Sequence, residues 1–148
     1  MLFRSPQRGL ATAEDVLQRG PRWRQPEAGV AAIHAQEALE DWPALGRLAD
    51  QLEPMRAASP FLGAHLDRAR GRSLVADGKV DEGVAALRRA VDSFDRIPVV
   101  FEAAQTREAL AEAVPGERAE LLRTALASYE RLGAAPSVER VRAKLEGG

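Results

Sequence analysis

Apolar residues recur along most of the chain at intervals of three and four residues, the spacing that places them on one face of an α-helix. Prolines and glycines interrupt this pattern at intervals, and no stretch alternates between apolar and polar residues as a half-buried strand does. The connections between the periodic segments are short, so neighbouring helices must run antiparallel. The pattern predicts helices at about residues 27–40, 43–57, 60–77, 81–97, 99–114, 117–132 and 137–146.

The first 25 residues carry a weaker pattern. Residues 1–10 are expected to be a frayed leader, followed by a short helix over residues 11–19 with Thr12 as its N-cap. Residues 1–5 show neither helical nor strand periodicity. One hypothesis is that the natural chain begins near Pro6 as a fragment of a longer gene product, and a genuine but disordered start is an equal alternative. We therefore expect a leader over residues 1–25 and one helical domain over residues 26–146.

One segment of the chain recurs 35 residues later. The stretch Leu87–Ile97 returns at Leu122–Leu132, with five of eleven positions identical and four more conservatively changed. A helix-forming segment that recurs at this period is typical of helical-hairpin repeat proteins, in which each hairpin buries its apolar face by stacking on the next. The repeat favours a binding or scaffolding role over an enzyme.

The segment from about residue 63 to 98 resembles a tetratricopeptide repeat. Small residues stand where two helices of such a repeat cross most closely, and large apolar residues fill the spaces beside them. The positions that carry the resemblance are Gly71, Leu74, Gly78, Gly83, Leu87 and Ala90. The next unit departs from the pattern, because Arg118 replaces a small residue. The resemblance implies an all-α, tetratricopeptide-like (TPR-like) stack of about three antiparallel helical hairpins, wound as a right-handed superhelix and closed by a capping helix.

Two phrases, residues 101–107 and 129–134, also resemble the C-terminal repeat regions of bacterial LuxR-type ATPase regulators and class III adenylate cyclases. The chain has no phosphate-binding glycine-rich loop that ends in Lys-Ser or Lys-Thr, and no helix-turn-helix follows Leu145. The resemblance therefore implies the docking or sensing part of such a signalling protein, separated from its output domains.

Composition excludes several classes of partner. The net charge of −1 gives no bulk attraction to nucleic acid or to an anionic membrane, and the single basic and aromatic cluster, residues 22–24, is too short for a nucleic-acid signature. No apolar run approaches the roughly 20 residues that span a bilayer. The chain has no cysteine, which excludes disulfides and thiolate metal sites and agrees with the cytoplasmic location that we expect.

No pattern points to catalysis, a cofactor or a metal. His34 and His65 are the only histidines, and neither has a second histidine or a carboxylate four residues later. Glu37 lies three residues after His34, which is permissive spacing but a weak two-ligand site. We expect both histidines on helix surfaces. Paired carboxylates stand at helix starts, where they offset the helix dipole.

A basic stripe is the strongest candidate for a binding site. His65, Arg68 and Arg72 follow one another at spacings of three and four, so they share one face of a helix. The tetratricopeptide resemblance places that face in the inner groove, where guanidinium groups suit an acidic peptide or a carboxylate terminus. Arg107 and Glu108 are the next candidates on this concave face. The alternative is a solvated face that neighbouring helices partly neutralise.

We therefore expect a protein- or peptide-binding module of a bacterial signalling or transcription regulator. The alternative is a structural spacer or a self-association module that forms a homodimer, which uncovered apolar residues on the last helix, Val138 and Val141, would favour. An enzyme or small-molecule sensor would need a closed pocket with convergent polar groups, and the sequence shows no such set.

Overall fold

The computed structural model describes residues 5–147, and these residues contain eight α-helices and no strand. The all-α prediction is confirmed. Three short 3-10 segments, η1 (Arg22–Arg24), η2 (Glu53–Ala58) and η3 (Pro115–Glu117), join helices. The α-helices are α1 (Pro6–Arg19), α2 (Gln25–Leu39), α3 (Trp42–Leu52), α4 (Pro60–Ala76), α5 (Val80–Arg96), α6 (Val100–Ala113), α7 (Arg118–Leu132) and α8 (Ala135–Glu146). No helix in this range is both long and apolar enough to cross a membrane.

Local signals in the sequence set the helix ends. Ser59 caps α4 by accepting a hydrogen bond from the Leu62 amide, and Pro60 occupies the first helical position. Gly78 and Gly133 follow α4 and α7 with φ angles of 83° and 69°, in the left-handed region that glycine adopts without strain. Pro54 ends the regular part of α3, as predicted, and the chain continues as η2.

The expected leader is instead largely helical. Ser5 caps α1 by accepting from the Arg8 amide, and Pro6 is the first residue of the helix. Thr12 is not a cap, because its hydroxyl donates to the Arg8 carbonyl inside the helix. Ala13 is buried where α1 packs on α2. The prediction of a frayed segment is therefore wrong for residues 6–10, whereas the short helix predicted over residues 11–19 forms the rest of α1. Residues 1–4, on which part of the fragment hypothesis rests, lie outside the described residues.

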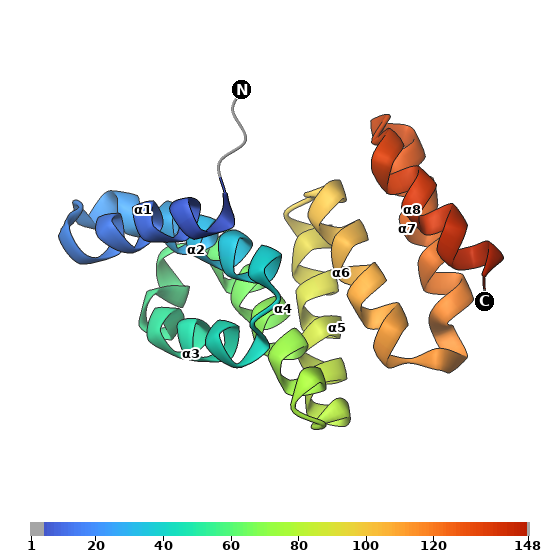
Figure 1. Cartoon of the computed structure of the whole chain (residues 1–148), viewed down its shortest axis with the longest axis horizontal. Coiled ribbons are helices and arrows are strands. Elements are labelled where there is room, and N and C mark those ends of the chain that lie inside the picture. Colours follow the sequence, from blue (N-terminus) through green and yellow to red (C-terminus); the bar gives the residue numbers. More distant parts are fainter. Residues whose placement is uncertain (1–4, 148) are drawn as a thin grey trace.

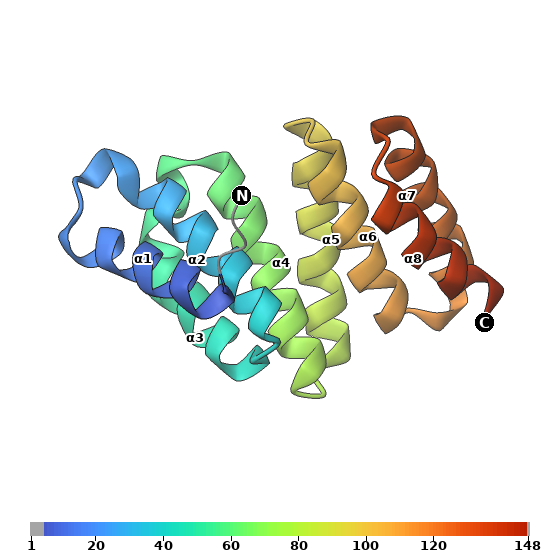
Figure 2. The same cartoon turned by 45° about the horizontal axis from the view of Figure 1, so that its top comes forward.

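The helices follow one another along the long axis of the molecule (Figures 1 and 2). Each helix packs mainly on a neighbour in sequence, and α4 with α5 forms the largest contact. In addition, α4 contacts both α2 and α6. These three helices therefore lie in the order α2, α4, α6.

Glycines determine how closely α4 and α5 approach. A Cβ atom on Gly71 would lie 2.6 Å from Leu87 Cγ, and one on Gly83 would lie 2.8 Å from the Gly71 carbonyl oxygen and 2.6 Å from Val75 Cγ2. Side chains at either position would force the helices apart. The expectation that these two glycines mark the closest crossing is confirmed.

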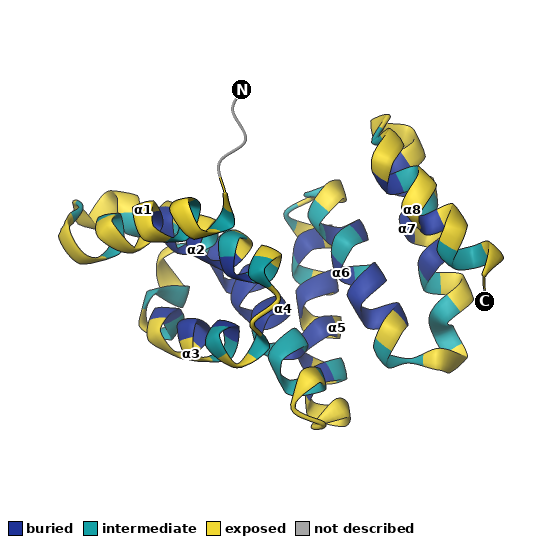
Figure 3. Cartoon of the chain, viewed as in Figure 1, coloured by how far each residue is buried: buried dark blue, intermediate teal, exposed yellow. Residues whose placement is uncertain are grey.

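The first half of α4 is buried on every side (Figure 3). Each residue from Leu62 to Ala69 is buried, including His65 and Arg68. The reason is that α2, α3, α5 and α6 all pack around this helix. The first two positions of the basic stripe therefore face neighbouring helices and not an open groove. Phe101 of α6 is 40% exposed, and its ring packs in a T-shaped arrangement with that of Tyr129.

Candidate functional site

Arg68 of α4 lies between two carboxylates from the helices on either side. Its Nη1 donates to Glu102 Oε2 of α6 at 2.9 Å, and its Nη2 donates to Glu37 Oε1 of α2 at 3.0 Å. Only 3% of the Arg68 side chain is exposed. Because a buried charge is tolerated when it is paired and hydrogen bonded, Arg68 joins α2, α4 and α6 through one compensated network.

Arg72 lies one turn after Arg68 and is the only member of the stripe that reaches solvent to a large extent. Its Nη1 donates to Glu37 Oε2 at 2.8 Å, and 31% of its side chain is exposed. Its guanidinium carbon lies 4.9 Å from the centre of the Trp42 ring, within the range of a cation–π contact. Arg72 thus extends the network toward the surface beside Trp42.

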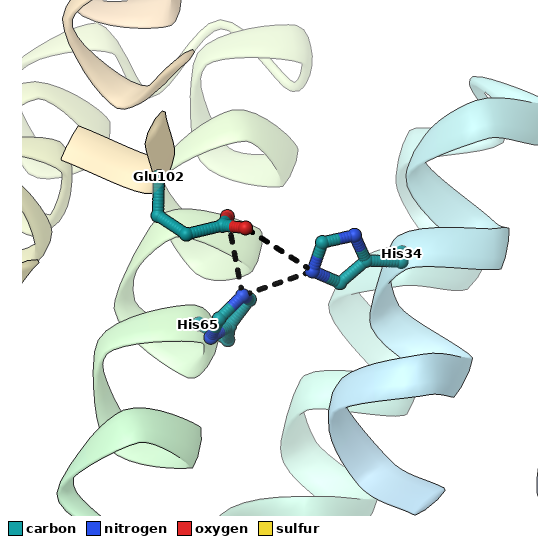
Figure 4. A group of neighbouring side chains, drawn as sticks. All are labelled: His34, His65 and Glu102. Atoms are coloured by element: carbon teal, nitrogen blue, oxygen red, sulfur yellow. Dashed lines mark hydrogen bonds and ion pairs between the residues drawn. The ribbon is translucent and has the colours of Figure 1, made fainter. Parts of the chain in front are cut away.

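The two histidines meet next to this network (Figure 4). The Nε2 atoms of His34 and His65 are 3.0 Å apart. His65 Nε2 lies 3.4 Å from Glu102 Oε2, and His34 Nε2 lies 3.9 Å from Glu102 Oε1. His34 is 44% exposed, as expected for a surface histidine, whereas His65 is fully buried and the surface expectation is wrong for it. The residues that pack His65 in place include the aromatic rings of Phe61 and Phe94.

Hydrogen bonding fixes which nitrogen of His65 faces the cluster. His65 Nδ1 lies 2.9 Å from the Phe61 carbonyl oxygen. A carbonyl only accepts hydrogen bonds, so Nδ1 carries a proton and donates it. Nε2 is consequently the nitrogen directed at His34 and Glu102.

The environment favours a neutral His34 and an ionised Glu102. Burial lowers the pKa of His34; the charge of Glu102 opposes this shift, and His65 and Arg68 reinforce it. Burial on its own would raise the pKa of Glu102, but the hydrogen bond with His65 and the charge of Arg68 outweigh it and lower this pKa to about 2. At neutral pH the cluster therefore presents an imidazole without charge and a carboxylate.

We expect acid to destabilise the protein in two stages. Both pKa values are depressed in the folded state, so the unfolded chain binds more protons and stability falls as pH falls. The contribution of His34 begins to be lost below pH 6.5, its ordinary pKa. The contribution of Glu102 is lost between pH 4.5 and about 2 and amounts to about 3 kcal/mol. Urea unfolding at a series of pH values measures the slope. Glu102→Gln should flatten it below pH 4.5, and an unchanged slope would contradict this assignment.

Glu108 is the centre of a second, separate network. It accepts hydrogen bonds from the Tyr129 hydroxyl at 2.7 Å, from Arg140 Nη2 at 2.7 Å and from Lys144 Nζ at 3.0 Å. Burial would raise its pKa, and the bonds from Arg140, Tyr129 and Lys144 lower it instead. Since Glu108 is only 7% exposed, its charge is used to hold α6, α7 and α8 together.

The five predicted site residues thus lie in three networks. His65, Arg68 and Arg72 share the first, and Glu108 belongs to the second. Arg107 forms a third with Asp95 of α5, to which its Nη2 donates at 2.6 Å. His65, Arg68 and Glu108 are buried, so they contact a partner only if the surrounding helices separate.

Glu102 was not among the site residues predicted from the sequence, and Glu37 was not recognised as a partner of the basic stripe. One signal was available: 34 residues separate His34 from Arg68, and 34 separate Arg68 from Glu102. A tetratricopeptide unit has this length, so the resemblance to that family would imply corresponding positions in successive units for the three residues. Residues at corresponding positions on stacked helices are expected to face one another.

The same region holds the one group of potential metal ligands among residues 5–147. His34, His65 and Glu102 each offer one ligand atom, and these atoms lie within 4.8 Å of one another. Spacing along the sequence predicted no metal site here, because the three residues come from three different helices. The chain matches no protein-family model and no curated protein.

Proposed function

We propose that the chain is a TPR-like helical repeat module that binds a protein or peptide, as the docking or sensing part of a cytoplasmic bacterial signalling or transcription regulator. The recurrence of residues 87–97 at 122–132 and the glycine crossing of α4 and α5 support a hairpin repeat. The buried members of the basic stripe have internal partners. We therefore assign the contact surface to the cleft beside Trp42.

This Trp42 cleft lies between α3 and α4 and has a volume of about 460 Å³. That volume is within the usual range of about 300–1,000 Å³ for ligand sites. Trp42 also lines a second cleft of about 210 Å³, which reaches Leu87 of α5 and Ala109 of α6. The residues that line the first cleft include Trp42, Pro43, Arg47, Arg70, Ser73 and Leu74.

The observation that carries the proposal is that Trp42 and Arg47 line the same cleft. Trp42 is half-buried, so one part of its ring remains available. Arg47 is exposed on the rim, and no described residue forms an ion pair with it. By contrast, Arg70 already pairs with Asp50 and Glu53. Aromatic and arginine side chains dominate binding energy at protein interfaces. The partner segment should offer an apolar side chain to Trp42 and a carboxylate to Arg47.

A peptide selected from a random library displayed on phage, with the full chain immobilised, tests this proposal. Trp42→Ala should weaken its binding by about 30-fold or more, the loss of a hot-spot side chain worth about 2 kcal/mol. Arg47→Glu should also weaken it, and titration calorimetry measures both.

Two variants outside the Trp42 cleft serve as matched controls. Trp23 is 78% exposed on η1, and Arg123 is exposed on α7. Trp23→Ala and Arg123→Glu should leave the affinity unchanged. A selected peptide that binds the Trp42 and Arg47 variants as tightly as the wild type would place the site elsewhere. A library that yields no enriched peptide would count against peptide binding itself.

The spacer or self-association alternative has less support. It depended on uncovered Val138 and Val141, but Val141 is fully buried and Val138 packs half-buried in the core of α6, α7 and α8. The last helix therefore lacks the apolar face that a homodimer would use. We expect the mass in solution to stay that of a monomer as concentration rises.

A further inference from the structure

The separations within the His34, His65 and Glu102 cluster suit atoms that share one metal ion. Metal bonds of about 2.0–2.1 Å place neighbouring ligands about 3.0–3.4 Å apart, in octahedral or tetrahedral geometry respectively. The two Nε2 atoms are 3.0 Å apart, and His65 Nε2 is 3.4 Å from Glu102 Oε2. The remaining separation, 3.9 Å from His34 Nε2 to Glu102 Oε1, needs only a small rotation of a partly exposed imidazole.

Hydrogen bonds alone do not satisfy all three groups of this cluster when both histidines are neutral. His65 Nδ1 already donates to Phe61, so in the neutral ring Nε2 offers a lone pair. The proton between the two Nε2 atoms can then come only from His34. In this neutral state Glu102 Oε2, 3.4 Å away, faces the same lone pair, and a hydrogen bond between the two forms only when His65 Nε2 also takes up a proton. A cation at the centre would be attracted to both nitrogens and to the carboxylate at once.

We propose that His34, His65 and Glu102 bind one divalent transition-metal ion, with Zn²⁺ as the expected occupant. Imidazole nitrogen favours zinc and its neighbours in the first transition row, whereas Mg²⁺ and Ca²⁺ prefer oxygen ligands alone. Two histidines and one carboxylate form a set that leaves at least one coordination position free. None of these three residues lines the Trp42 cleft, so the metal site does not rest on the proposed peptide binding.

Neighbouring groups already hold the ligands in position. The Phe61 carbonyl orients His65, and Arg68 Nη1 holds Glu102 Oε2 at 2.9 Å. Such outer contacts commonly fix metal ligands and tune their basicity. The charge of Arg68 opposes an incoming cation, and Glu37, bonded to the same guanidinium, offsets part of that charge. His34 is the exposed ligand, so we expect the ion to enter from the side of the cluster where His34 lies.

Zn²⁺ binding to the full chain, freed of any histidine tag, tests the proposal. Competition with a chromogenic zinc chelator should show one ion bound per chain. The chain has two histidines and no cysteine, so His34→Gln leaves a single imidazole. We expect this change to weaken binding by more than about 100-fold, beyond the effect usual for outer-shell residues. Glu139→Gln, at an exposed carboxylate of α8, is the matched control and should bind as the wild type does.

Nitrogen NMR of the imidazoles supplies a second measurement, which avoids replacing the fully buried His65. Addition of Zn²⁺ should shift the Nε2 resonances of both histidines and leave His65 Nδ1 protonated. The absence of saturable binding, equal affinity in His34→Gln, or a His65 resonance that does not move would each overturn the proposal.

Discussion

Replacing Arg68 with methionine should destabilise the protein by about 3–5 kcal/mol, the usual cost of breaking a buried ion pair from one side. Methionine fills much of the same volume but leaves Glu37 and Glu102 buried without their shared partner. Chemical unfolding followed by circular dichroism measures the loss. Glu37 keeps Arg72 as a partner, so the additional change Glu102→Gln, which removes the remaining uncompensated charge, should restore a large part of the stability.

An exposed ion pair of the same type provides the control. Arg88 donates to Glu117, and their side chains are 46% and 43% exposed. Arg88→Met should cost no more than about 1 kcal/mol, because solvent screens such pairs. If Arg68→Met lowered the free energy of unfolding as little as Arg88→Met, solvent would have to screen the network around Arg68 as well.

Gly83→Ala is expected to destabilise the protein by about 2–3 kcal/mol, although alanine favours a helix by about 1 kcal/mol over glycine. The added methyl group would meet the Gly71 carbonyl oxygen and the Val75 amide nitrogen, at 2.8 and 2.9 Å. Backbone atoms cannot rotate away as a side chain does, so α4 and α5 must move apart. Denaturant titration of the purified variant measures the change.

Gly9→Ala tests whether this cost arises from the crossing. Gly9 lies inside α1, where an added Cβ would meet only Ala35 Cβ at an ordinary 3.8 Å. This variant should gain about 0.5–1 kcal/mol from the better helix former. A Gly83→Ala protein as stable as the wild type would mean that α4 and α5 are less tightly packed than their geometry indicates.

The helices were predictable because their ends depend on local signals. Ser59 with Pro60, and Gly78 and Gly133, act through their own backbone angles and nearest amides. The same Ser-Pro signal at residues 5–6 started α1, but the weak apolar pattern that follows concealed it. The all-α fold therefore followed from the sequence, and the extent of the first helix did not.

The site was predictable only in part, because its charges are balanced across helices. Spacing along α4 correctly placed His65, Arg68 and Arg72 on one face. Their partners Glu37 and Glu102 come from α2 and α6, more than 30 residues away in each direction. No pattern within one helix reveals whether solvent or a distant carboxylate meets a cation. A spacing of 34 residues relates Arg68 to Glu102, whereas Glu37 lies 31 residues before Arg68 and follows no such interval.

The two ion pairs of Arg68 also affect how the protein unfolds. An array in which every element contacts only its neighbours can lose its ends one at a time, because each loss is independent of the far end. Here detachment of α2 or of α6 removes one of the two carboxylates that bind Arg68 and leaves one side of a buried guanidinium without its hydrogen-bond partner. We therefore expect the loss of one end of the array to cost free energy at its centre, so that the two halves unfold more cooperatively than independent neighbours would.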